Sequence, residues 1–475
     1  MNSAKLDKKT TQLLAVMLFG TFIAMLNQTV ISPALPSIMK SLDITANQGQ
    51  LLTTIFSLVT GVMVPTTAFL FRKFKIKKLF ITAMLAFTAG SYLAAFSFSY
   101  PMLLTSRILQ ALGVGVLMSM IQFVIMRTFP EHKRGVAMGI VGIVCAAAPA
   151  VGPVMAGAIV DAFGWNSVFF TIAPLATIDV ILAIFLMKNP EEIQTDTSAK
   201  LDFLSVLFSV IGFGGLLYCF SFATEYGWGS LPVLGALFAG ILLLVLFVVR
   251  QKRSQQPFLD LRVMNYRDFT VSMVIGMILN ATLLSLMTIL PIYMQSIANF
   301  SALLTGTMMV PGAVVMAVVS PFAGKIYDQY GPRKLSIVGL ALFSATIVGF
   351  SMISLSSSFA YICAVYTIWM FSMALLVMPL TTWGLNALPP SLMAHGTALY
   401  NTVKTIAGAL GTAILVLIMT AATNYAASSA PETAALIGVR CAFAVAAATG
   451  ILSLILGILF IQPAASKKTE EISSR

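Results

Sequence analysis

Residues 303–340 read LLTGTMMVPGAVVMAVVSPFAGKIYDQYGPRKLSIVGL. The stretch begins with an apolar run, passes through a short turn rich in charge, and enters a second apolar run at Leu335. An α-helix rises 1.5 Å per residue and the hydrocarbon core of a bilayer is about 30 Å thick, so a span needs about 20 apolar residues. The two runs therefore predict two membrane-spanning helices joined by an exposed turn.

The same alternation of apolar runs and short turns continues through the whole chain of 475 residues, of which 59% are hydrophobic and 9% charged. A soluble domain carries about a quarter charged residues, so this composition excludes an ordinary soluble fold. The short segments of alternating hydrophobicity that indicate a membrane barrel are not seen, which leaves helices as the spanning element. We predict an all-α integral membrane protein with fourteen spans, at residues 12–32, 50–70, 79–99, 102–124, 136–160, 166–187, 203–222, 232–250, 269–294, 303–323, 335–355, 359–383, 396–421 and 437–461.

The basic residues predict how these helices are oriented. All but four of the 28 Lys and Arg residues fall in the termini or in turns on one side of the predicted bundle; the exceptions are Lys40, Arg107, Lys404 and Arg440. Short basic loops stay in the cytoplasm, and an even number of spans brings both termini to one side, so we expect both termini to be cytoplasmic. Because the basic residues are scattered over short loops, we expect no nucleic-acid partner despite the net charge of +12.

Other chemical motifs are scarce. The four cysteines lie in or beside the predicted spans, without the paired spacing of a disulfide framework or a metal site. His132 and His395 fall in predicted cytoplasmic loops. Because no nucleophile triad, phosphate-binding glycine loop or metal motif is found, we predict that the protein is not an enzyme and uses no metal or cofactor.

An internal repeat indicates the architecture. Residues 65–79 and 321–335 share one register of proline, small, apolar and basic residues, with each matching pair 256 residues apart. Six-helix units would place these turns about 200 residues apart, so the excess indicates two helices inserted between two parallel six-helix repeats. We predict three parts: an N-terminal six-helix bundle (1–187), a cytoplasmic linker with two inserted helices (188–268), and a C-terminal six-helix bundle with a short cytoplasmic tail (269–475).

The turn at residues 324–334 resembles the signature loop of the major facilitator superfamily. In that family the acidic and basic residues at the positions of Asp328 and Arg333 form a charge relay that latches the inward gate. The first copy of the turn departs from the pattern, since Arg72 stands where the family usually has Asp and Lys75 where it has Gly. The resemblance implies gate loops centred on Arg72, Lys73, Arg134, Asp328 and Arg333.

Two further motifs strengthen the resemblance. Arg107 and Gln110 in the fourth span are similar to the family's Arg-x-x-Gln-Gly motif, with Ala111 in place of Gly. The fifth span is similar to the antiporter signature of exporters, in which a Gly-Pro pair permits a helix bend; the alternative is a packing seam of small residues. The residues of this helix-bend motif are Pro149, Gly152, Pro153 and Gly157.

Fourteen spans with these motifs resemble the fourteen-helix drug:proton antiporter branch of the superfamily, which includes bacterial multidrug and lincomycin-resistance exporters. The resemblance covers nearly the whole chain and implies a multi-pass protein of the bacterial cytoplasmic (inner) membrane. It also implies that spans one, two, four and five face spans nine, ten, twelve and thirteen across a central cavity. The predicted cavity residues are Asn27, Gln28, Arg107, Gln110, Asn401 and Lys404.

The ionisable residues within the spans bear on coupling, because a charge at the bilayer centre is expensive and therefore a functional candidate. Asn27 stands where the family often has an Asp that exchanges protons, and an amide cannot titrate. Asp179 is the deepest acid, although it could instead be a protonated or hydrogen-bonded group held between helices. Glu225 lies nearer the outer end of its span, and Lys404 could itself lose a proton when desolvated. Asp179, Glu225 and Lys404 are therefore the predicted proton-coupling candidates.

Arg107 and Lys404 bear on the substrate as well. They place two cations near the predicted cavity with no carboxylate on a lining helix, which favours neutral or anionic amphipathic substrates over lipophilic cations. The alternative is that both cations are neutralised by backbone carbonyls and by Gln110 or Asn27, and serve structure alone.

Three functions follow from this reading. The first is a proton-coupled exporter of drugs or amphipathic small organic molecules, working as a monomer in the bilayer by alternating access and using the proton gradient as its energy source. The second is a facilitator or importer of an organic acid, motivated by the missing first-helix Asp and the two cations. The third is a membrane receptor without transport activity, which would bind a ligand that never crosses a sealed bilayer.

Overall fold

The computed structural model describes residues 8–44, 46–190, 193, 202–254, 257, 259–426 and 430–462, and every regular element in this part of the chain is helical. The N-terminal half consists of α1 (Lys8–Thr29), α2 (Ile31–Leu42), α3 (Ala46–Lys73), α4 (Ile76–Ala95), α5 (Tyr100–Thr128), α6 (Glu131–Phe163) and α7 (Asn166–Leu186). Two helices follow, α8 (Phe203–Tyr226) and α9 (Leu231–Arg253). The C-terminal half consists of η1 (Leu261–Asn265), α10 (Arg267–Ile292), η2 (Tyr293–Ile297), α11 (Ala302–Tyr330), α12 (Pro332–Ser351), α13 (Phe359–Asn386), η3 (Pro390–Leu392), α14 (Met393–Tyr425) and α15 (Pro431–Phe460).

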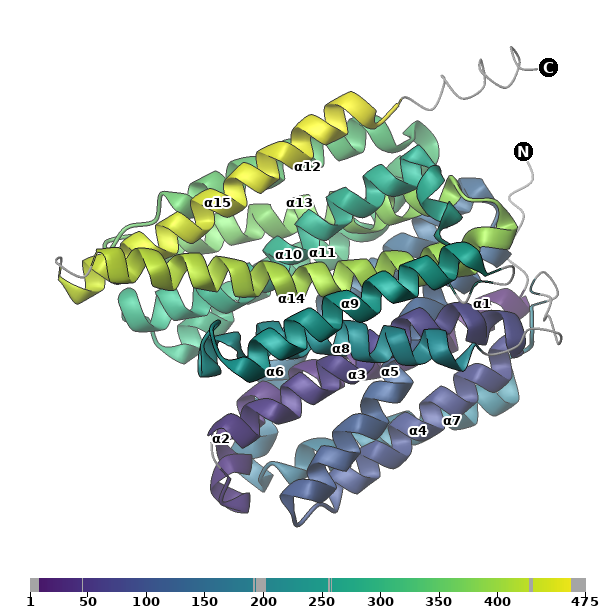
Figure 1. The fold of residues 1–475 in the computed structure, drawn as a ribbon, viewed down its shortest axis with the longest axis horizontal. Coiled ribbons are helices and arrows are strands. Elements are labelled where there is room, and N and C mark those ends of the chain that lie inside the picture. Colours follow the sequence, from purple (N-terminus) through teal and green to yellow (C-terminus); the bar gives the residue numbers. More distant parts are fainter. Residues whose placement is uncertain are drawn as a thin grey trace.

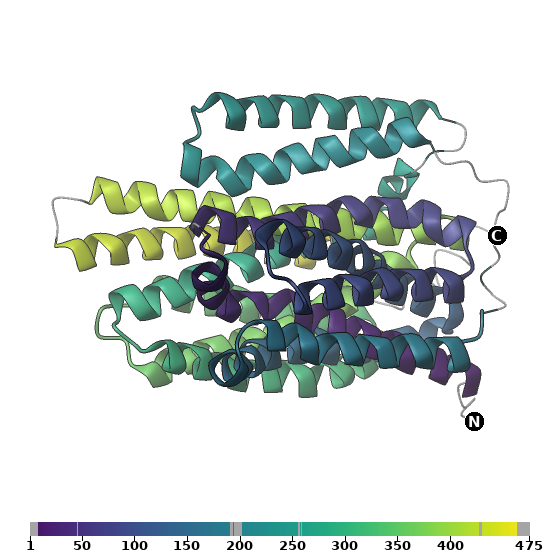
Figure 2. The ribbon, with the colours of Figure 1, turned by 90° about the horizontal axis from the view of Figure 1, so that it is seen from below.

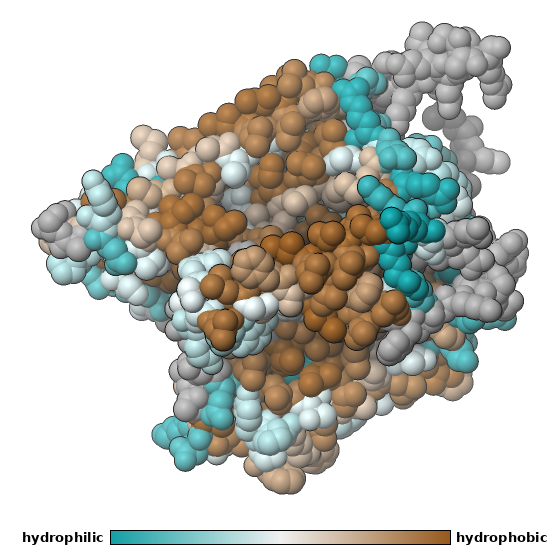
Figure 3. Space-filling model, in the orientation of Figure 1, coloured by the Kyte–Doolittle hydropathy of each residue, from teal (hydrophilic) through white to brown (hydrophobic). Residues whose placement is uncertain are grey.

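The lengths of these helices confirm a polytopic membrane protein. Among the described residues, thirteen helices are long and apolar enough to cross a bilayer, and α8 adds a shorter apolar stretch at Leu204–Leu216. Figure 3 shows the corresponding surface, with a broad apolar band on the side of the bundle and polar residues gathered at its ends. The architecture is therefore the fourteen-helix membrane fold that the sequence predicts.

One break between helices differs from the prediction of a single continuous first span at 12–32. α1 ends at Thr29, and a separate short helix, α2, begins at Ile31. Pro33 has no N–H group to donate, and in a continuous helix its ring would clash with the carbonyl group of Thr29. The proline therefore accounts for the break.

Both described ends of the chain lie at one end of the bundle (Figure 1). The basic turns between α3 and α4, between α5 and α6, and between α11 and α12 lie on the same side of the membrane as these termini, because an even number of spans separates each turn from the next and from either terminus. By the positive-inside rule this end is cytoplasmic.

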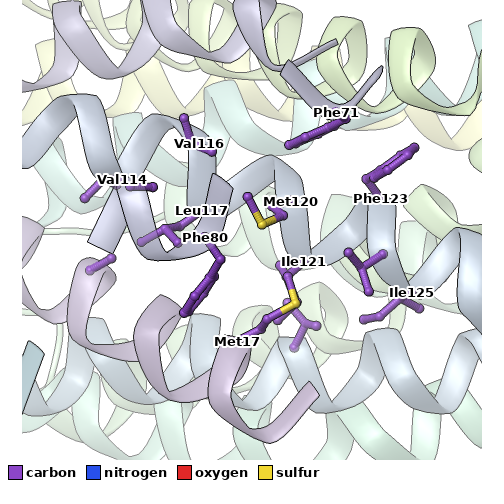
Figure 4. Packing of buried hydrophobic residues seen from close by; sticks show 14 of the residues in the cluster. Met17, Phe71, Phe80, Val114, Val116, Leu117, Met120, Ile121, Phe123 and Ile125 are labelled. Atoms are coloured by element: carbon purple, nitrogen blue, oxygen red, sulfur yellow. The ribbon is translucent and has the colours of Figure 1, made fainter. Parts of the chain in front are cut away.

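The hydrophobic core of the N-terminal half lies among α1, α3, α4 and α5, and Figure 4 shows part of it. Met17 and Phe80 approach Met120 and Ile121 there, and the rings of Phe71 and Phe123 stack with centroids 4.8 Å apart. The same cluster extends into the C-terminal half through residues at the cytoplasmic ends of α10, α13 and α14 and in the turn after α13: Phe269, Met273, Met378, Leu385, Leu388, Met393, Ala394, Ala398, Leu399 and Tyr400. The two halves are thus joined by apolar packing at the cytoplasmic end.

The helices α8 and α9 form a hairpin beside the two halves (Figure 2). α8 packs against α3 of the N-terminal half and α14 of the C-terminal half. At its cytoplasmic end, Asp202 accepts hydrogen bonds from Ser205 N (3.2 Å), Arg250 Nε (2.8 Å) and Arg250 Nη2 (2.9 Å). These bonds from Arg250 lower the pKa of Asp202 to about 2 and tie the two helices of the hairpin together.

On the other side of the bundle, α6 and α11 cross at close range, and glycines make the crossing possible. A Cβ atom on Gly324 would collide with the carbonyl oxygen of Gly135, and one on Gly139 would lie 2.5 Å from the carbonyl oxygen of Ser320. Small residues at helix crossings let backbones approach closely within a membrane. The cytoplasmic contact between the halves therefore depends on the absence of side chains at these positions.

We predict that Gly324→Ala shifts the protein away from this closed arrangement, because the added methyl group meets backbone atoms of α6 that cannot rotate away. Overpacking of this kind costs about 1–3 kcal/mol, so the ratio of closed to open molecules should fall about tenfold. The measurement is the distance distribution between spin labels at Lys75 and Tyr330, two exposed positions at the cytoplasmic ends of the halves. Gly306→Ala, in α11 with no atom within 4 Å of the added Cβ, is the control. Unchanged distances in Gly324→Ala would contradict the close crossing.

Candidate translocation site and cytoplasmic gate

Asp328 forms the main polar contact of the gate. From the cytoplasmic end of α11, its carboxylate accepts hydrogen bonds from the backbone N–H groups of Gly135 and Val136, both at 2.8 Å. These N–H groups lie near the start of α6, where the helix dipole also favours a negative charge. In the described part of the chain Asp328 makes no ion pair with Arg333, so the expected charge relay between them is replaced by a bond from one half of the protein to the other.

A second polar bridge crosses the gate. Arg134 donates from Nη1 to Asn386 Oδ1 at 2.6 Å and from Nε to the carbonyl oxygen of Phe129 at 3.0 Å. Asn386 in turn donates to the hydroxyl oxygen of Tyr327 at 3.2 Å. The sequence singled out Arg134 but neither Asn386 nor Tyr327, because no motif marks an amide and a phenol near the ends of two different helices.

A cavity of about 400 Å³ lies at the cytoplasmic end of the bundle, between the ends of α3 and α5 and the start of α14. It does not reach the predicted cavity residues Asn27, Gln110 or Lys404. We therefore separate it from the translocation site. Its lining residues are Phe71, Arg72, Phe123, Arg127, Ile193, Pro257, Asp260, Arg262, Pro390, Ser391, Leu392, Ala394 and His395.

The segment after the hairpin is anchored in this cavity. The backbone N–H of Asp260 donates to His395 Nδ1 at 3.1 Å, and Arg262 binds the Asp260 carboxylate at 2.6 Å. Burial acts to raise the pKa of Asp260, but the hydrogen bonds from Arg262 outweigh it and hold the pKa below its ordinary value. His395 was predicted in a loop; it lies instead in the first turn of α14 and is buried. Lys73 is half-buried at the end of α3, beside the cavity residue Arg72.

Asn401 closes the path between the halves farther into the membrane. From α14, its Nδ2 donates to Gln122 Oε1 at 2.9 Å and approaches Ser119 Oγ at 3.4 Å, both on α5. All three residues are buried. We call these three residues the amide seal. Asn401 was a predicted site residue; its partners Gln122 and Ser119 were missed, and their only signal was polarity within an apolar span.

Lys404 lies one turn beyond Asn401 on the same helix. Its backbone carbonyl accepts a hydrogen bond from Asn280 Nδ2 of α10 at 2.8 Å. Its side chain is half-buried and close enough to the Cys145 thiol of α6 to interact with it. Among the described residues, the Lys404 ammonium group makes neither a hydrogen bond nor an ion pair.

Arg107 has a very different environment. Its guanidinium is 1% exposed, donates to Gln110 Oε1 at 2.8 Å and to the carbonyl oxygen of Leu52 at 3.4 Å, and lies 4.2 Å from the ring centroid of Phe56. The cation is therefore held by a neutral amide, a backbone carbonyl and an aromatic face. The sequence left open that Arg107 and Lys404 are both neutralised by backbone carbonyls and neutral amides. Within the described residues, only Arg107 has such partners.

Asn27 and Gln110 complete the cluster around Arg107. Asn27 Nδ2 donates to Gln110 Oε1 at 3.2 Å, and Gln110 Nε2 donates to Ser91 Oγ at 3.2 Å. Gln110 thus links α1, α4 and α5 through one side chain. Gln28 is exposed and lies outside this cluster, so the structure brings together three of the four N-terminal residues predicted for the cavity.

Asp179 lies within the N-terminal half rather than between the halves. It is fully buried on α7, and neither of its carboxyl oxygens has a hydrogen-bond partner. A Cβ atom on Gly20 of α1 would collide with its Oδ2, so the carboxyl group is pressed directly against the backbone of α1. Asp161, by contrast, is exposed at the outer end of α6. The side chain of Glu225 lies outside the described residues.

The helix-bend motif of α6 divides into two parts. Gly152 packs against α1, where a Cβ atom would collide with Thr29 Oγ1, whereas Gly157 has no atom within 4 Å of such a Cβ. Pro153 is exposed, and the side chain of Pro149 lies outside the described residues. Gly152 therefore belongs to a packing seam with α1.

Similarity to known proteins agrees with this fold. The family model described as Major Facilitator Superfamily matches residues 17–412. The "Uncharacterized MFS-type transporter YcnB" of Bacillus subtilis is 43% identical over 451 residues, 95% of each chain, and the "Lincomycin resistance protein LmrB" of Listeria monocytogenes is 36% identical over 409 residues, 86% of each chain. The crystal structure of the human organic anion transporter MFSD10 superposes with a TM-score of 0.68 at 15% identity, covering 94% of this chain and 99% of that chain, which shows a shared fold.

We predict that Gln110→Leu destabilises the protein, because it leaves the buried Arg107 and Asn27 side chains without their shared acceptor. Loss of a buried hydrogen bond to a charged group costs about 1.5–3 kcal/mol. The thermal unfolding midpoint of the purified protein should fall by several degrees, whereas Gln28→Leu, at the exposed glutamine beside Asn27, should leave it nearly unchanged. Equal midpoints for the two variants would show that Gln110 does not hold the cluster.

Proposed function

Because the chain belongs to the major facilitator superfamily, a family of multi-pass membrane transporters of small organic molecules, we propose that it is a proton-coupled exporter of drugs or amphipathic small organic molecules. It would work by alternating access in the bacterial cytoplasmic (inner) membrane, as a monomer. Support for export comes from the relative named for lincomycin resistance and from the motif in α6 that is similar to the antiporter signature.

The observation that carries the proposal is the two-layered closure on the cytoplasmic side. The Asp328 bonds to α6 form one layer and the amide seal forms the other. Each layer consists of a few hydrogen bonds, worth about 0.5–3 kcal/mol apiece in net free energy. Closure of this strength can be reversed by substrate binding or by a change of protonation, which is what alternating access requires.

Asp179 is the proposed proton carrier, with the proton gradient as the energy source. A carboxyl group with no hydrogen-bond partner and no exposed surface is favoured as the neutral acid, because the charged form would lose its hydration without compensation. Loss of the proton would place a charge against Gly20 and Phe80, and movement of α1 away from α7 would relieve that cost by admitting water. α1 also packs on α5 and α6, so such a movement reaches the cluster at Asn27.

A second candidate function has one observation in its favour. The cation of Lys404 without a described partner also suits a facilitator or importer of organic acids. Such a protein would move its substrate without moving protons through Asp179, and the following experiment separates the two functions.

We predict that Asp179→Asn abolishes proton movement coupled to substrate. The purified protein is reconstituted in sealed liposomes that contain a pH-sensitive dye, a pH gradient is imposed, and amphiphiles of each charge class are added in turn. The unaltered protein should change the internal pH when a substrate is added, and Asp179→Asn should not, since an amide carries no exchangeable charge.

The matched control is Asp161→Asn, which alters an exposed carboxylate at the outer end of α6 and should retain coupling. Proton movement that persists in Asp179→Asn would exclude Asp179 as the carrier. Substrate flux without proton movement in the unaltered protein would overturn the antiporter and support a facilitator. Binding without flux would indicate a receptor.

A further inference from the structure

We propose that Lys404 holds the anionic group of the transported molecule, so that the preferred substrates are amphipathic organic anions bearing a carboxylate or a similar group. The inference rests on the proposed transport function and adds to it a substrate class and a binding residue. It is carried by the contrast between two cations in the same membrane domain.

First, Arg107 and Lys404 have different surroundings within the membrane. Arg107 is almost fully buried and has an amide, a carbonyl and an aromatic ring around its guanidinium. Lys404 is half-buried and lies nearer the cytoplasm than Arg107, and its ammonium group has no hydrogen bond or ion pair within the described chain. A cation inside a membrane protein is costly unless it is paired or hydrated, so a site that leaves it accessible is one that a ligand can complete.

The second step is the position of Lys404 relative to the amide seal. Residues three apart on a helix share a face, so Lys404 points toward the same gap between the halves as Asn401. A helical rise of 1.5 Å per residue places it about 4.5 Å along α14 from Asn401, on the side away from the cytoplasm. Asn401 bonds Gln122 and Ser119 of α5, so this face of α14 is turned toward the N-terminal half.

The third step concerns the acidic residues, none of which among the described side chains neutralises Lys404. Asp179 is enclosed between α7 and α1, and Asp328 is bonded to α6 at the gate. Asp161 is exposed at the outer end of α6. The compensating negative charge therefore comes from a bound molecule.

An anion at Lys404 would also interact with the closure mechanism. It would lie one helical turn from Asn401 and would attract the amide donor of that residue, which now bonds Gln122 and Ser119. An acceptor on the substrate can therefore replace the acceptor on α5. Substrate binding at Lys404 would then be coupled to opening of the amide seal at Asn401, one turn away on the same helix.

The test compares two dyes that share a xanthene ring system, fluorescein as the anion and rhodamine 123 as the cation. Equilibrium binding to the purified protein is measured by fluorescence, and flux is measured in liposomes. The unaltered protein should bind fluorescein more tightly than rhodamine 123. Lys404→Gln should weaken fluorescein binding about tenfold or more, the loss expected for a hydrogen bond between charged groups, without weakening rhodamine 123 binding.

Lys404→Arg is the second variant, because it keeps the positive charge but does not release a proton near neutral pH. Retained preference for fluorescein in Lys404→Arg supports the anion site. A loss as large as that in Lys404→Gln would overturn the proposal, because a positive charge at position 404 would then not be what holds the anion. Lys40→Gln, at an exposed lysine near the outer end, controls for the change in net charge.

Three further outcomes would overturn the anion site: no binding of either dye, tighter binding of rhodamine 123 by the unaltered protein, or an equal loss of both dyes in Lys404→Gln. A thermal unfolding midpoint within the error of the unaltered protein shows that the variants are folded. Failure of the proposed function gives a different pattern, in which fluorescein binds through Lys404 but does not cross the bilayer.

Discussion

Hydrocarbon cannot solvate polar groups, so every polar group within the membrane needs a hydrogen-bond partner inside the protein. This structure follows from that requirement. Backbone groups satisfy it by forming helices, and side chains within the helices satisfy it with a few shared partners. Gln110 is an example, because its amide group forms hydrogen bonds with Arg107, Asn27 and Ser91 at the same time. Several buried polar atoms of the described residues lack a hydrogen-bond partner, among them both carboxyl oxygens of Asp179, and the proposed proton transfer would act there.

Among the described residues, the polar contacts that join the halves are hydrogen bonds in which at most one partner is charged, rather than ion pairs. Asp328 binds backbone N–H groups, Arg134 binds an amide oxygen, and Asn401 binds Gln122. A buried ion pair is strongly destabilised by loss of either partner, whereas these bonds can be exchanged for water when the gate opens. Backbone donors also have fixed positions, and the glycine crossing of α6 and α11 brings them within reach. These contacts therefore fix the closed position of the gate while contributing only a moderate free energy of closure.

Sequence and structure agree where the information is local. Long apolar runs and the side of the basic turns determine the spans and their orientation, and the three-residue spacing of Arg107 and Gln110 predicts their contact within α5. The partners of Asn401 and Asp328 could not be predicted, because they depend on the relative depth of helices from different halves, about which one sequence carries no local signal. The break at Thr29 and the burial of His395 depend likewise on a proline clash and on the segment that packs over α14.

The hairpin of α8 and α9 imposes a mechanical condition on transport. Because α8 rests on α3 from one half and on α14 from the other, it could not follow both halves if they rock as proposed, and at least one of these surfaces would slide in each cycle. Dispersion contacts between apolar side chains have no fixed direction, so they can be shifted along a helix and remade with little loss. The hairpin therefore would shield one seam between the halves from lipid while α3 and α14 slide beneath it. Within the described residues the hairpin does not pack on the opposite seam, between α6 and α11, so the two seams differ although the two halves repeat one plan.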